Sequence, residues 1–430
     1  MNLAILIPTL CILFLMFLGV PVWISMFAGV LPYFIWFNNF SFAASTVIQR
    51  LVATMETSSY LAIPFFVTAG AVMNYSGISK RMLDFADTLV GHLTGGLGHV
   101  NVLLSVLMGG ISGSAAADAA MECKVLVPEM ERHGYDKGFS AAVTLASSLI
   151  TPIIPPGMGL IVYAMLADVS VGRMFAAGYL PGFVTAVLMM GLVFVISKKH
   201  NYKGSRDHIA PFKEILKAFF SGFWGLLIPF GLLMALRGGL FSANEAGAIC
   251  AIYAVIIGAF VYKELKWKHV WPIIKESLLG TATVMITICG AMAMSYWLNA
   301  ERIPNLLAKI IVESGLPKVG FLLIVFAMLF VFGMFMTGGI TIFAPLLAPI
   351  AKALGIDPIH FGMVMVFTLG IGNMSPPFGI VLYQVSSLLE IKLEDLIKSS
   401  FPFLVLMVGC ALIFTLVPWF STWLPGILYG

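Results

Sequence analysis

The sequence predicts an all-α polytopic membrane protein made of two inverted repeats, each with a re-entrant hairpin and a broken helix. The first observation is composition: of 430 residues, 60% are hydrophobic and 10% charged, and the mean hydropathy is +1.01. A soluble domain is about one quarter charged. The second is the length of the apolar runs, which suits helical spans and not the alternating strands of an outer-membrane barrel. The third is a pair of matching interruptions, at residues 149–159 and 371–379.

The composition also excludes several classes of function. The net charge of +4 is small and lies mostly in loops, so it informs membrane orientation rather than nucleic-acid binding. Five cysteines are scattered without CxxC spacing and are interpreted as small apolar side chains. The sequence has no P-loop, HExxH or GxSxG motif. We therefore expect neither an ATP hydrolase nor another enzyme, and no cofactor.

The chain begins with apolar runs at residues 3–19 and 20–37, which predict a tight helical pair. The start lacks a basic region and a small-residue cleavage site, so we interpret it as the first span and not as a signal peptide. A further span over 60–75 leads into 79–92, where charged and apolar residues alternate in the pattern of a helix lying on the membrane surface. Residues 301–314 form a second amphipathic arm of this kind.

Two predicted helices, at 139–166 and 359–389, break at clusters of proline and glycine. Residues 149–159 contain three prolines and two glycines, and 371–379 repeat the pattern with Pro376 and Pro377. Inside a bilayer the freed backbone groups must face protein, a polar cavity or an ion. A kinked structural helix is the alternative, but two matching interruptions in two halves favour a binding site. Unwound carbonyls would then coordinate a monovalent cation, while the half-helix amino termini face an anion.

Each broken helix follows an apolar segment that is itself interrupted near its centre. Residues 98–128 are interrupted by the glycines and serines of 109–114, and residues 319–348 by Thr337, Gly338 and Gly339. A re-entrant hairpin with its tip at depth is the more economical interpretation of each. Close helix packing through small residues is the alternative, whereas the hydroxyls of Ser112 and Ser114 beside glycines suit contact with a cation or a carboxylate.

The two halves match when one is placed over the other at an offset of 221 residues. We divide the chain into a first repeat (1–197), a Lys-rich linker (198–213) and a second repeat (214–430). The positive-inside rule places the linker in the cytoplasm, which orients the repeats oppositely and puts both termini in the periplasm. Between residues 126 and 156 the identities are Leu126/Leu347, Pro128/Pro349, Gly134/Gly355, Asp136/Asp357, Val143/Val364, Ile150/Ile371, Pro155/Pro376 and Pro156/Pro377.

Several charged residues lie in or beside the predicted spans. Membrane charge is usually functional, and the role of Asp118 stays open. Glu122 and Lys124 are interpreted as a solvated pair at the interface. Ser242 and Glu245 have the spacing of a capping box at a helix start. Arg302 is either an interfacial snorkelling residue or a contact for an anionic substrate.

Together these motifs resemble the large membrane subunit of tripartite ATP-independent periplasmic (TRAP) transporters, the DctM-like family. The resemblance extends over nearly the whole chain. The motifs that carry it are Gly113-Ser-Ala-Ala-Ala-Asp118, Leu126-Val-Pro128, His133-Gly-Tyr-Asp136, Ile153-Ile-Pro-Pro156, Leu180-Pro-Gly182, Ser242-Ala-Asn-Glu-Ala246, Leu354-Gly-Ile-Asp-Pro358-Ile-His-Phe-Gly362 and Ser375-Pro-Pro377.

The resemblance implies a scaffold and an elevator-type transport domain in the bacterial inner membrane. It implies sodium-coupled import of an organic anion delivered by a periplasmic binding protein, with a small four-helix membrane subunit as a separate chain. Family cation sites lie where each hairpin tip meets its broken helix. At the matching positions one site comprises Gly110, Ser112, Gly113, Thr151 and Pro152, and the other Thr337, Gly338, Gly372, Asn373 and Met374.

The anion would lie between these sites. Sialic acid or another sugar acid is favoured as substrate, with a C4-dicarboxylate next, and an ion-coupled transporter, exchanger or channel that needs no binding protein is the alternative. One departure from the family pattern stands out, because Thr337 follows residues 333–336 where an aspartate is expected. The expected substrate-binding residues are Ser114, Pro155, Pro156, Arg302, Ser375 and Pro376.

Overall fold

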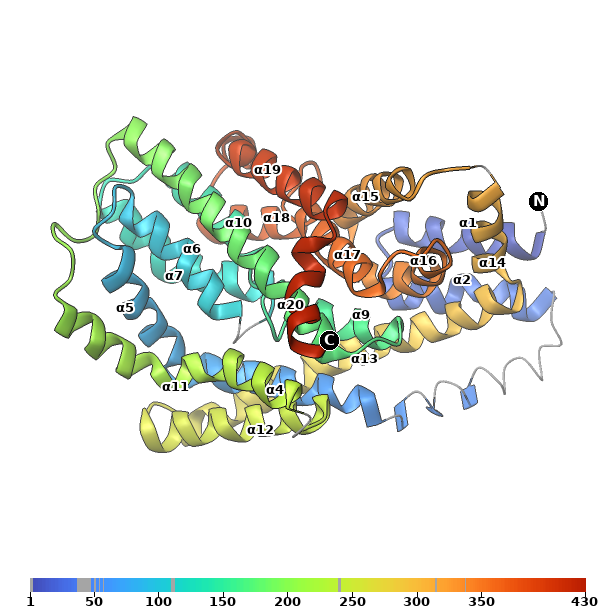
Figure 1. Ribbon diagram of the computed structural model, residues 1–430, viewed down its shortest axis with the longest axis horizontal. Coiled ribbons are helices and arrows are strands. Elements are labelled where there is room, and N and C mark those ends of the chain that lie inside the picture. Colours follow the sequence, from blue (N-terminus) through green and yellow to red (C-terminus); the bar gives the residue numbers. More distant parts are fainter. Residues whose placement is uncertain are drawn as a thin grey trace.

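The computed structural model describes residues 3–36, 48–49, 52–53, 55–56, 58–109, 113–238, 241–313, 315–336 and 338–430. Within these ranges all regular secondary structure is helical, as Figure 1 shows. The predicted fold class of an all-α polytopic membrane protein is therefore confirmed.

Six helical segments of the described chain are long and apolar enough to cross a bilayer. Each has at least 18 residues, and a helix needs about 20 residues to span the ~30 Å hydrocarbon layer, more when it is tilted. Two of them include a short irregular turn: α12 continues into a π-helical turn, Ile257–Val261, and α13 follows a 3-10 turn, Trp267–His269. The six are α10 (Val171–His200), α11 (Phe212–Arg237), α12 (Ala243–Ile256), α13 (Val270–Ala300), α15 (Lys318–Phe335) and α19 (Leu393–Leu416).

The amino-terminal helices pack against the middle of the chain. Gly19, with φ of +75°, and Pro21 separate α1 (Leu3–Phe17) from α2 (Val22–Trp36). A 3-10 turn, Ser58–Leu61, precedes α4 (Ala62–Tyr75). Helix α2 packs on α13, and α4 packs on both α12 and α13. Figure 1 shows α4, α11, α12 and α13 along one side of the molecule.

The start of α12 is held by the predicted capping box. The hydroxyl of Ser242 accepts from the backbone N–H of Glu245 at 3.4 Å, and a carboxylate oxygen of Glu245 accepts from the backbone N–H of Ser242 at 2.7 Å. Two N–H groups without intrahelical partners are thereby satisfied. The structural interpretation of Glu245 is confirmed.

The basic linker between the halves is fixed to the amphipathic arm α5 (Ile78–Val90). Arg206 forms ion pairs with Asp87 at 2.7 Å and with Glu214 at 2.6 Å. Partial burial opposes the charge of the guanidinium, but the hydrogen bonds from Glu214 and Asp87 outweigh it, and the pKa of Arg206 is raised. Through these two ion pairs Arg206 holds the linker to α5 and to the start of α11.

Corresponding elements of the two halves lie 221 residues apart. Helix α8 begins at Lys137 and α17 at Pro358, and α7 ends at Arg132 where α16 ends at Ala353. The same order of arm, hairpin and broken helix thus occurs twice. The bounds are α5 (Ile78–Val90) and α14 (Ile303–Glu313) for the arms, α6 (Gly96–Gly109), α7 (Ala115–Arg132), α15 (Lys318–Phe335) and α16 (Gly339–Ala353) for the hairpins, and α8 (Lys137–Ser147), α9 (Met158–Leu166), α17 (Pro358–Gly372) and α18 (Ile380–Leu389) for the broken helices.

The carboxyl-terminal part forms two helices, although the apolar run of residues 401–419 taken alone indicates a single span. Helix α19 begins eight residues earlier, at Leu393, and α20 (Trp419–Tyr429) follows it and packs on α10. The first turn of α19 carries Glu394 and Asp395, which the positive end of the helix dipole accommodates. Hydropathy alone places the start of a helix at its first apolar residue and so misses this polar turn.

Candidate cation and substrate site

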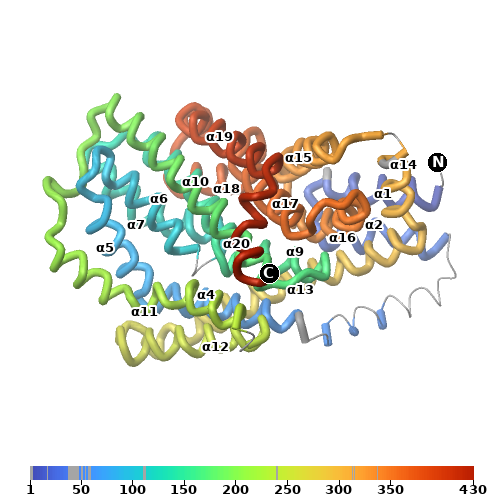
Figure 2. Tube along the Cα trace, viewed as in Figure 1, coloured from blue at the N-terminus to red at the C-terminus, as the bar shows by residue number. Residues whose placement is uncertain are grey.

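The hairpins and broken helices of the two halves pack across one another. Helix α7 of the first hairpin packs on α18, and α16 of the second hairpin packs on α9. The side-chain amide of Gln384 on α18 donates to the carbonyl of Ala116 on α7 at 2.9 Å, and the Tyr163 hydroxyl on α9 donates to the carbonyl of Pro358 at 2.8 Å. In the tube of Figure 2, α18 and α9 lie near the middle of the molecule, with α7 on one side and α16 on the other.

The first break spans the ten residues between α8, which ends at Ser147, and α9, which begins at Met158. The hairpin backbone approaches it through glycines. A Cβ at Gly109 would lie 3.2 Å from the carbonyl oxygen of Thr151, and one at Gly113, where φ is +57°, would lie 2.7 Å from the carbonyl oxygen of Pro156. Any larger residue at Gly113 would clash with this carbonyl. Gly113 is thus brought to Pro156 and Gly109 to Thr151, whereas Gly110 and Ser112 lie outside the described residues.

The second break lies between α17, which ends at Gly372, and α18, which begins at Ile380. A Cβ on Gly372 would lie 2.5 Å from the Cα of Gly333, so α15 crosses the end of α17 with backbones in contact. The carbonyl of Asn373 accepts from the amides of Val381 and Leu382, at 3.0 and 3.3 Å. These bonds fold the break back onto the start of α18.

Polar groups at the second break are few. The hydroxyl of Ser375 donates to the carbonyl of Ile371 at 2.9 Å, and Met374 is buried. The side-chain oxygen Oδ1 of Asn373 is buried with no hydrogen-bond partner in the described part of the chain. Such an atom marks a position where a cation or a water can bind. Thr337 lies outside the described residues, and the adjacent Gly338 faces Thr287 and Val22 of the helices α13 and α2, at 3.6 and 3.8 Å from a Cβ position.

A buried polar cluster joins the first hairpin to the first broken helix. The Thr151 hydroxyl lies 2.5 Å from Oδ2 of Asp118 and 3.2 Å from the Ser105 carbonyl. The Ser105 hydroxyl donates to Oε1 of Glu122 at 2.9 Å, and Ser147 lies 3.3 Å from Oε2 of the same carboxylate. All five side chains are fully buried. Sequence reasoning left Asp118 unassigned, although acidic residues at i and i+4 in an apolar segment share one helix face.

The interpretation of Glu122 and Lys124 as a solvated interfacial pair is wrong. Glu122 is fully buried, while Lys124 is exposed on the opposite side of α7. The two side chains are two residues apart on a helix, and residues at that spacing do not face each other. Nearness in sequence to the charged residues 129–137 is therefore a poor guide to Glu122, whose direction is set by the helix period.

The expected substrate-binding residues lie at several places. Ser114 is the N-cap of α7 and accepts from the amide of Ala117 at 3.4 Å. Pro155 and Pro156 are buried in the first break and Ser375 in the second. Residues 155–156 and 376–377 are both joined by cis peptide bonds.

Arg302 lies at the exposed junction of α13 and α14, with a φ of +52°. None of the hydrogen bonds or ion pairs among the described residues joins it to either broken helix. In Figure 1, α14 lies at the end of the molecule occupied by α1 and α2, whereas α9 and α18 lie nearer the centre. Its contact with an anion stays a prediction.

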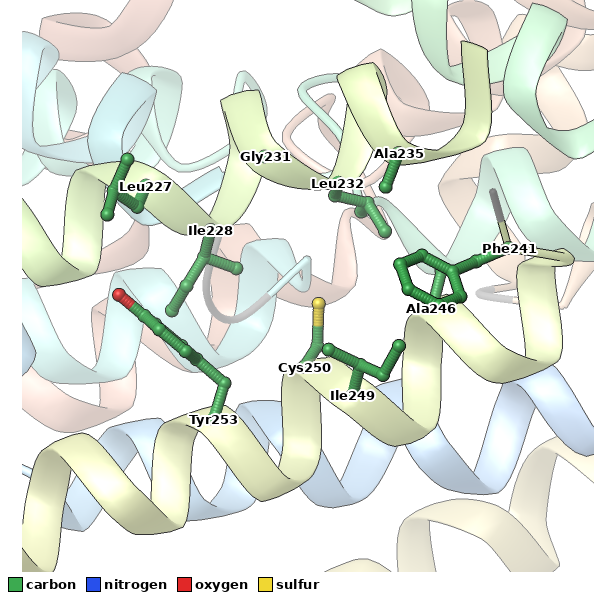
Figure 3. Close-up of a pocket in the computed structure, with 10 residues that line it drawn as sticks. All are labelled: Leu227, Ile228, Gly231, Leu232, Ala235, Phe241, Ala246, Ile249, Cys250 and Tyr253. Atoms are coloured by element: carbon green, nitrogen blue, oxygen red, sulfur yellow. The ribbon is translucent and has the colours of Figure 1, made fainter. Parts of the chain in front are cut away.

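A cavity of about 290 Å³ lies elsewhere, between α11 and α12. Its walls are apolar, with Leu227, Ile228, Ile249 and Cys250 among them, as Figure 3 shows. The hydroxyl of Tyr253, at one end, donates to the carbonyl of Trp224 at 2.8 Å. A pocket without a charged lining residue does not suit an organic anion, so we place no substrate there.

Comparison with known proteins decides the family. The family described as "Tripartite ATP-independent periplasmic transporter, DctM component" matches residues 9–420. The chain belongs to this family. It is 35% identical to the sialic acid TRAP transporter large permease protein SiaM of Vibrio cholerae, over 97% of both chains. It is 33% identical to the C4-dicarboxylate TRAP transporter large permease protein DctM of the same species, over 97% of this chain and 96% of that one.

The fold is also similar to that of a solved transporter. The crystal structure of the YdaH transporter of Alcanivorax borkumensis superimposes with a TM-score of 0.60 at 17% identity, covering 89% of this chain and 90% of that one. At that identity the likeness concerns the fold alone. The family and the apolar helices identify the protein as a multi-pass membrane permease of the TRAP type, and its relatives are permeases rather than enzymes.

Proposed function

We propose that the chain imports an organic anion across the bacterial inner membrane by coupling its movement to sodium. The observation that carries this proposal is the crossed packing of each hairpin with the broken helix of the other half. Discontinuous helices of this kind direct half-helix amino termini at anionic groups and leave backbone carbonyls for cations. The amino termini of α9 and α18 begin at Gly157 and Gly379, within the two breaks.

One sodium ion is proposed where the first hairpin tip meets the first break. Gly113 lies against Pro156 and Gly109 against the Thr151 carbonyl, so backbone oxygens of the break lie beside the described ends of the hairpin tip. Oxygen ligands of this type suit a hard monovalent cation. The proposed ligands are Gly110, Ser112, Gly113, Thr151 and Pro152.

The second sodium ion is proposed at the equivalent position of the second half. Here the free Oδ1 of Asn373 adds a side-chain oxygen to the backbone carbonyls. The proposed ligands are Thr337, Gly338, Gly372, Asn373 and Met374, and the anion lies between the two ions against Ser114, Pro155, Pro156, Ser375 and Pro376, with Arg302 as a further contact.

Movement of the anion is proposed to follow an elevator mechanism. The scaffold comprises α1, α2, α4, α11, α12 and α13, and the hairpins with the broken helices move against it. The amphipathic helices α5 and α14 precede the two hairpins in the chain and are the connecting arms. A small four-helix membrane subunit would cover the scaffold, and a periplasmic binding protein would deliver the anion to a face that also carries both chain termini.

Sialic acid or another sugar acid is the first candidate substrate, and a C4-dicarboxylate is the second. The relatives named for these anions are 35% and 33% identical to this chain, a difference too small to separate them. Uptake of labelled sialic acid and of labelled succinate into proteoliposomes separates them directly. A transported sugar acid that succinate does not inhibit is the expected result, and the reverse selectivity would assign the chain to dicarboxylates.

The dependence on partners is tested with the same vesicles. Proteoliposomes containing this chain and a small permease subunit should take up substrate when the binding protein is added outside, and omission of either partner should reduce uptake to background. Uptake by this chain alone would contradict the tripartite arrangement and would support the alternative of a transporter or exchanger that needs no binding protein.

A further inference from the structure

Two buried carboxylates lie side by side in the first hairpin, beyond its contact with the first break. Asp118 and Glu122 are separated by one turn of α7, and neither is exposed to any degree. Hydrogen bonds link them, directly or through one another, to oxygen and amide groups of the helices that pack on α7. These groups are Asn101 and Ser105 of α6, Thr144 and Ser147 of α8, and Thr151 of the break.

The cluster has more hydrogen-bond acceptors than donors. The hydroxyl of Thr151 has one hydrogen, yet both Asp118 and the Ser105 carbonyl lie within its reach. The hydroxyl of Ser147 has one hydrogen and three acceptors, the nearest being Oδ1 of Asn101 at 2.6 Å. Oδ1 of Asp118 is buried and has no partner among the described residues. A buried oxygen without a donor calls for a positive charge or a proton.

No basic side chain of the described residues compensates the two carboxylates. The ion pairs of this part of the chain include neither Asp118 nor Glu122. Of the helices that pack on α7, α8 has one basic residue, Lys137, at its first position, and α18 has Tyr383 as its titratable residue and no base. His99 of α6 contacts the carbonyl of Thr94 at 3.1 Å. On α7 itself Lys124 is exposed and Cys123 is a buried neutral thiol. Two unpaired buried charges would be costly.

The second half lacks both carboxylates of this cluster. At the positions 221 residues later, the second hairpin and broken helix have Gly339 for Asp118 and Phe343 for Glu122. Thr144 and Thr151 correspond to Met365 and Gly372, so their hydroxyls are absent, and Ser147 corresponds to Thr368, which keeps one. Helix α15 has no polar side chain after Lys318. The carboxylates are therefore not a requirement of the shared hairpin architecture.

We propose that Asp118 and Glu122 bind a sodium ion of their own, in addition to the ion at the first hairpin tip. This inference rests on the proposed sodium coupling. Two sodium ions in the first half would neutralise its two buried carboxylates, whereas the apolar second half binds one ion through neutral oxygens. The ligands are all oxygens, which hard cations prefer over transition metals, and the described residues contain no group of three or more His, Cys, Asp or Glu that would hold a multivalent metal.

The test compares Glu122→Gln with Glu129→Gln. The first removes a buried charge at nearly constant shape. The second removes a charge from a half-exposed glutamate of the same helix, where Glu129 pairs with Arg132 at 3.1 Å. In proteoliposomes with the small subunit and binding protein, the number of sodium ions moved per anion is measured from the reversal potential. We expect Glu122→Gln to lower this number by one and Glu129→Gln to leave it unchanged.

A second measurement keeps the proposal testable if Glu122→Gln fails to transport. Sodium stabilises the purified protein against heating when it binds the folded state. Loss of a charged ligand should raise the sodium concentration for half-maximal stabilisation roughly tenfold, and Glu122→Asp should restore part of the effect. An unchanged sodium number and unchanged stabilisation in Glu122→Gln would overturn the site.

Two further outcomes are distinguishable from these. If Glu122→Gln keeps its sodium number but loses a proton that the wild type co-transports, the compensating charge is a proton and the sodium assignment is wrong. If wild-type uptake is indifferent to sodium, the proposed function fails before Glu122 is tested.

Discussion

The two hairpins occupy equivalent places in the chain but meet their broken helices by different chemistry. The first contact is polar, with the Thr151 hydroxyl 2.5 Å from Asp118 and Ser105 bonded to Glu122. The second is made by backbone and apolar side chains, with Gly333 against Gly372 and Phe343 where the first half has Glu122. In both halves the hairpin backbone therefore approaches the broken helix closely, whereas buried carboxylates of the described chain occur only in the first half.

The largest effect is expected from filling the backbone contact of the second half. A Cβ on Gly372 would lie 2.5 Å from the Cα of Gly333, whose backbone cannot move aside as a flexible side chain can. Gly372→Ala should therefore abolish transport and lower the thermal unfolding temperature by several degrees, an overpacking cost of about 1–3 kcal/mol.

Gly370→Ala is the matched control for this variant. It lies two residues earlier on α17, and nothing stands within 4 Å of its Cβ position. It should transport as the wild type does. Equal behaviour of the two variants in uptake and melting assays would mean that the contact between Gly333 and Gly372 tolerates a side chain. The close backbone approach would then not be a requirement of the second half.

The next effect concerns two fully buried threonines, Thr151 in the first half and Thr368 in the second. Thr151→Val removes the donor that holds Asp118, and leaving a buried carboxylate short of a donor should raise the sodium concentration for half-maximal uptake roughly tenfold. Thr368, in α17, is also buried, but its hydroxyl has no partner among the described residues.

Thr368→Val should therefore leave sodium dependence unchanged and stabilise the fold by up to about 1 kcal/mol, since an unsatisfied polar group is removed. Sodium titration of uptake and thermal unfolding measure both variants. If Thr368→Val shifted the sodium titration as much as Thr151→Val does, the polar character of the first contact would have no special role.

Smaller effects are expected at the hairpin tips. Ser112→Ala and Thr337→Ala each remove one neutral hydroxyl from a proposed cation site while leaving the backbone oxygens in place, so each should raise the half-maximal sodium concentration only a few-fold. Uptake measured over a sodium series checks this. Unchanged sodium dependence in both variants would count against cation binding at the tips.

The sequence predicted the breaks well and the contacts between them poorly. Proline and glycine mark the interruptions at 149–159 and 371–379 locally, because each residue acts on its own backbone, and the structure has no helix at residues 148–157 or 373–379. The start of α19 was missed because Glu394 and Asp395 lower the local hydropathy although they begin a helix. Glu122 was misplaced for the same kind of reason, since its burial depends on α6 and α8 and not on its neighbours in sequence.

Sequence patterns cannot predict that each hairpin packs on the broken helix of the other half. Gln384 bonds to Ala116 across 268 residues, and no local signal connects the two positions. The motifs named the elements of the site, but only tertiary packing shows that α7 meets α18 and that α16 meets α9.

Sodium is proposed to drive anion movement at these two contacts. The most direct measurement is uptake of labelled anion into proteoliposomes containing this chain, its small subunit and the binding protein, with sodium outside, sodium on both sides, or potassium in its place. We expect concentrative uptake with the inward sodium gradient alone. Equal uptake under all three conditions would contradict it.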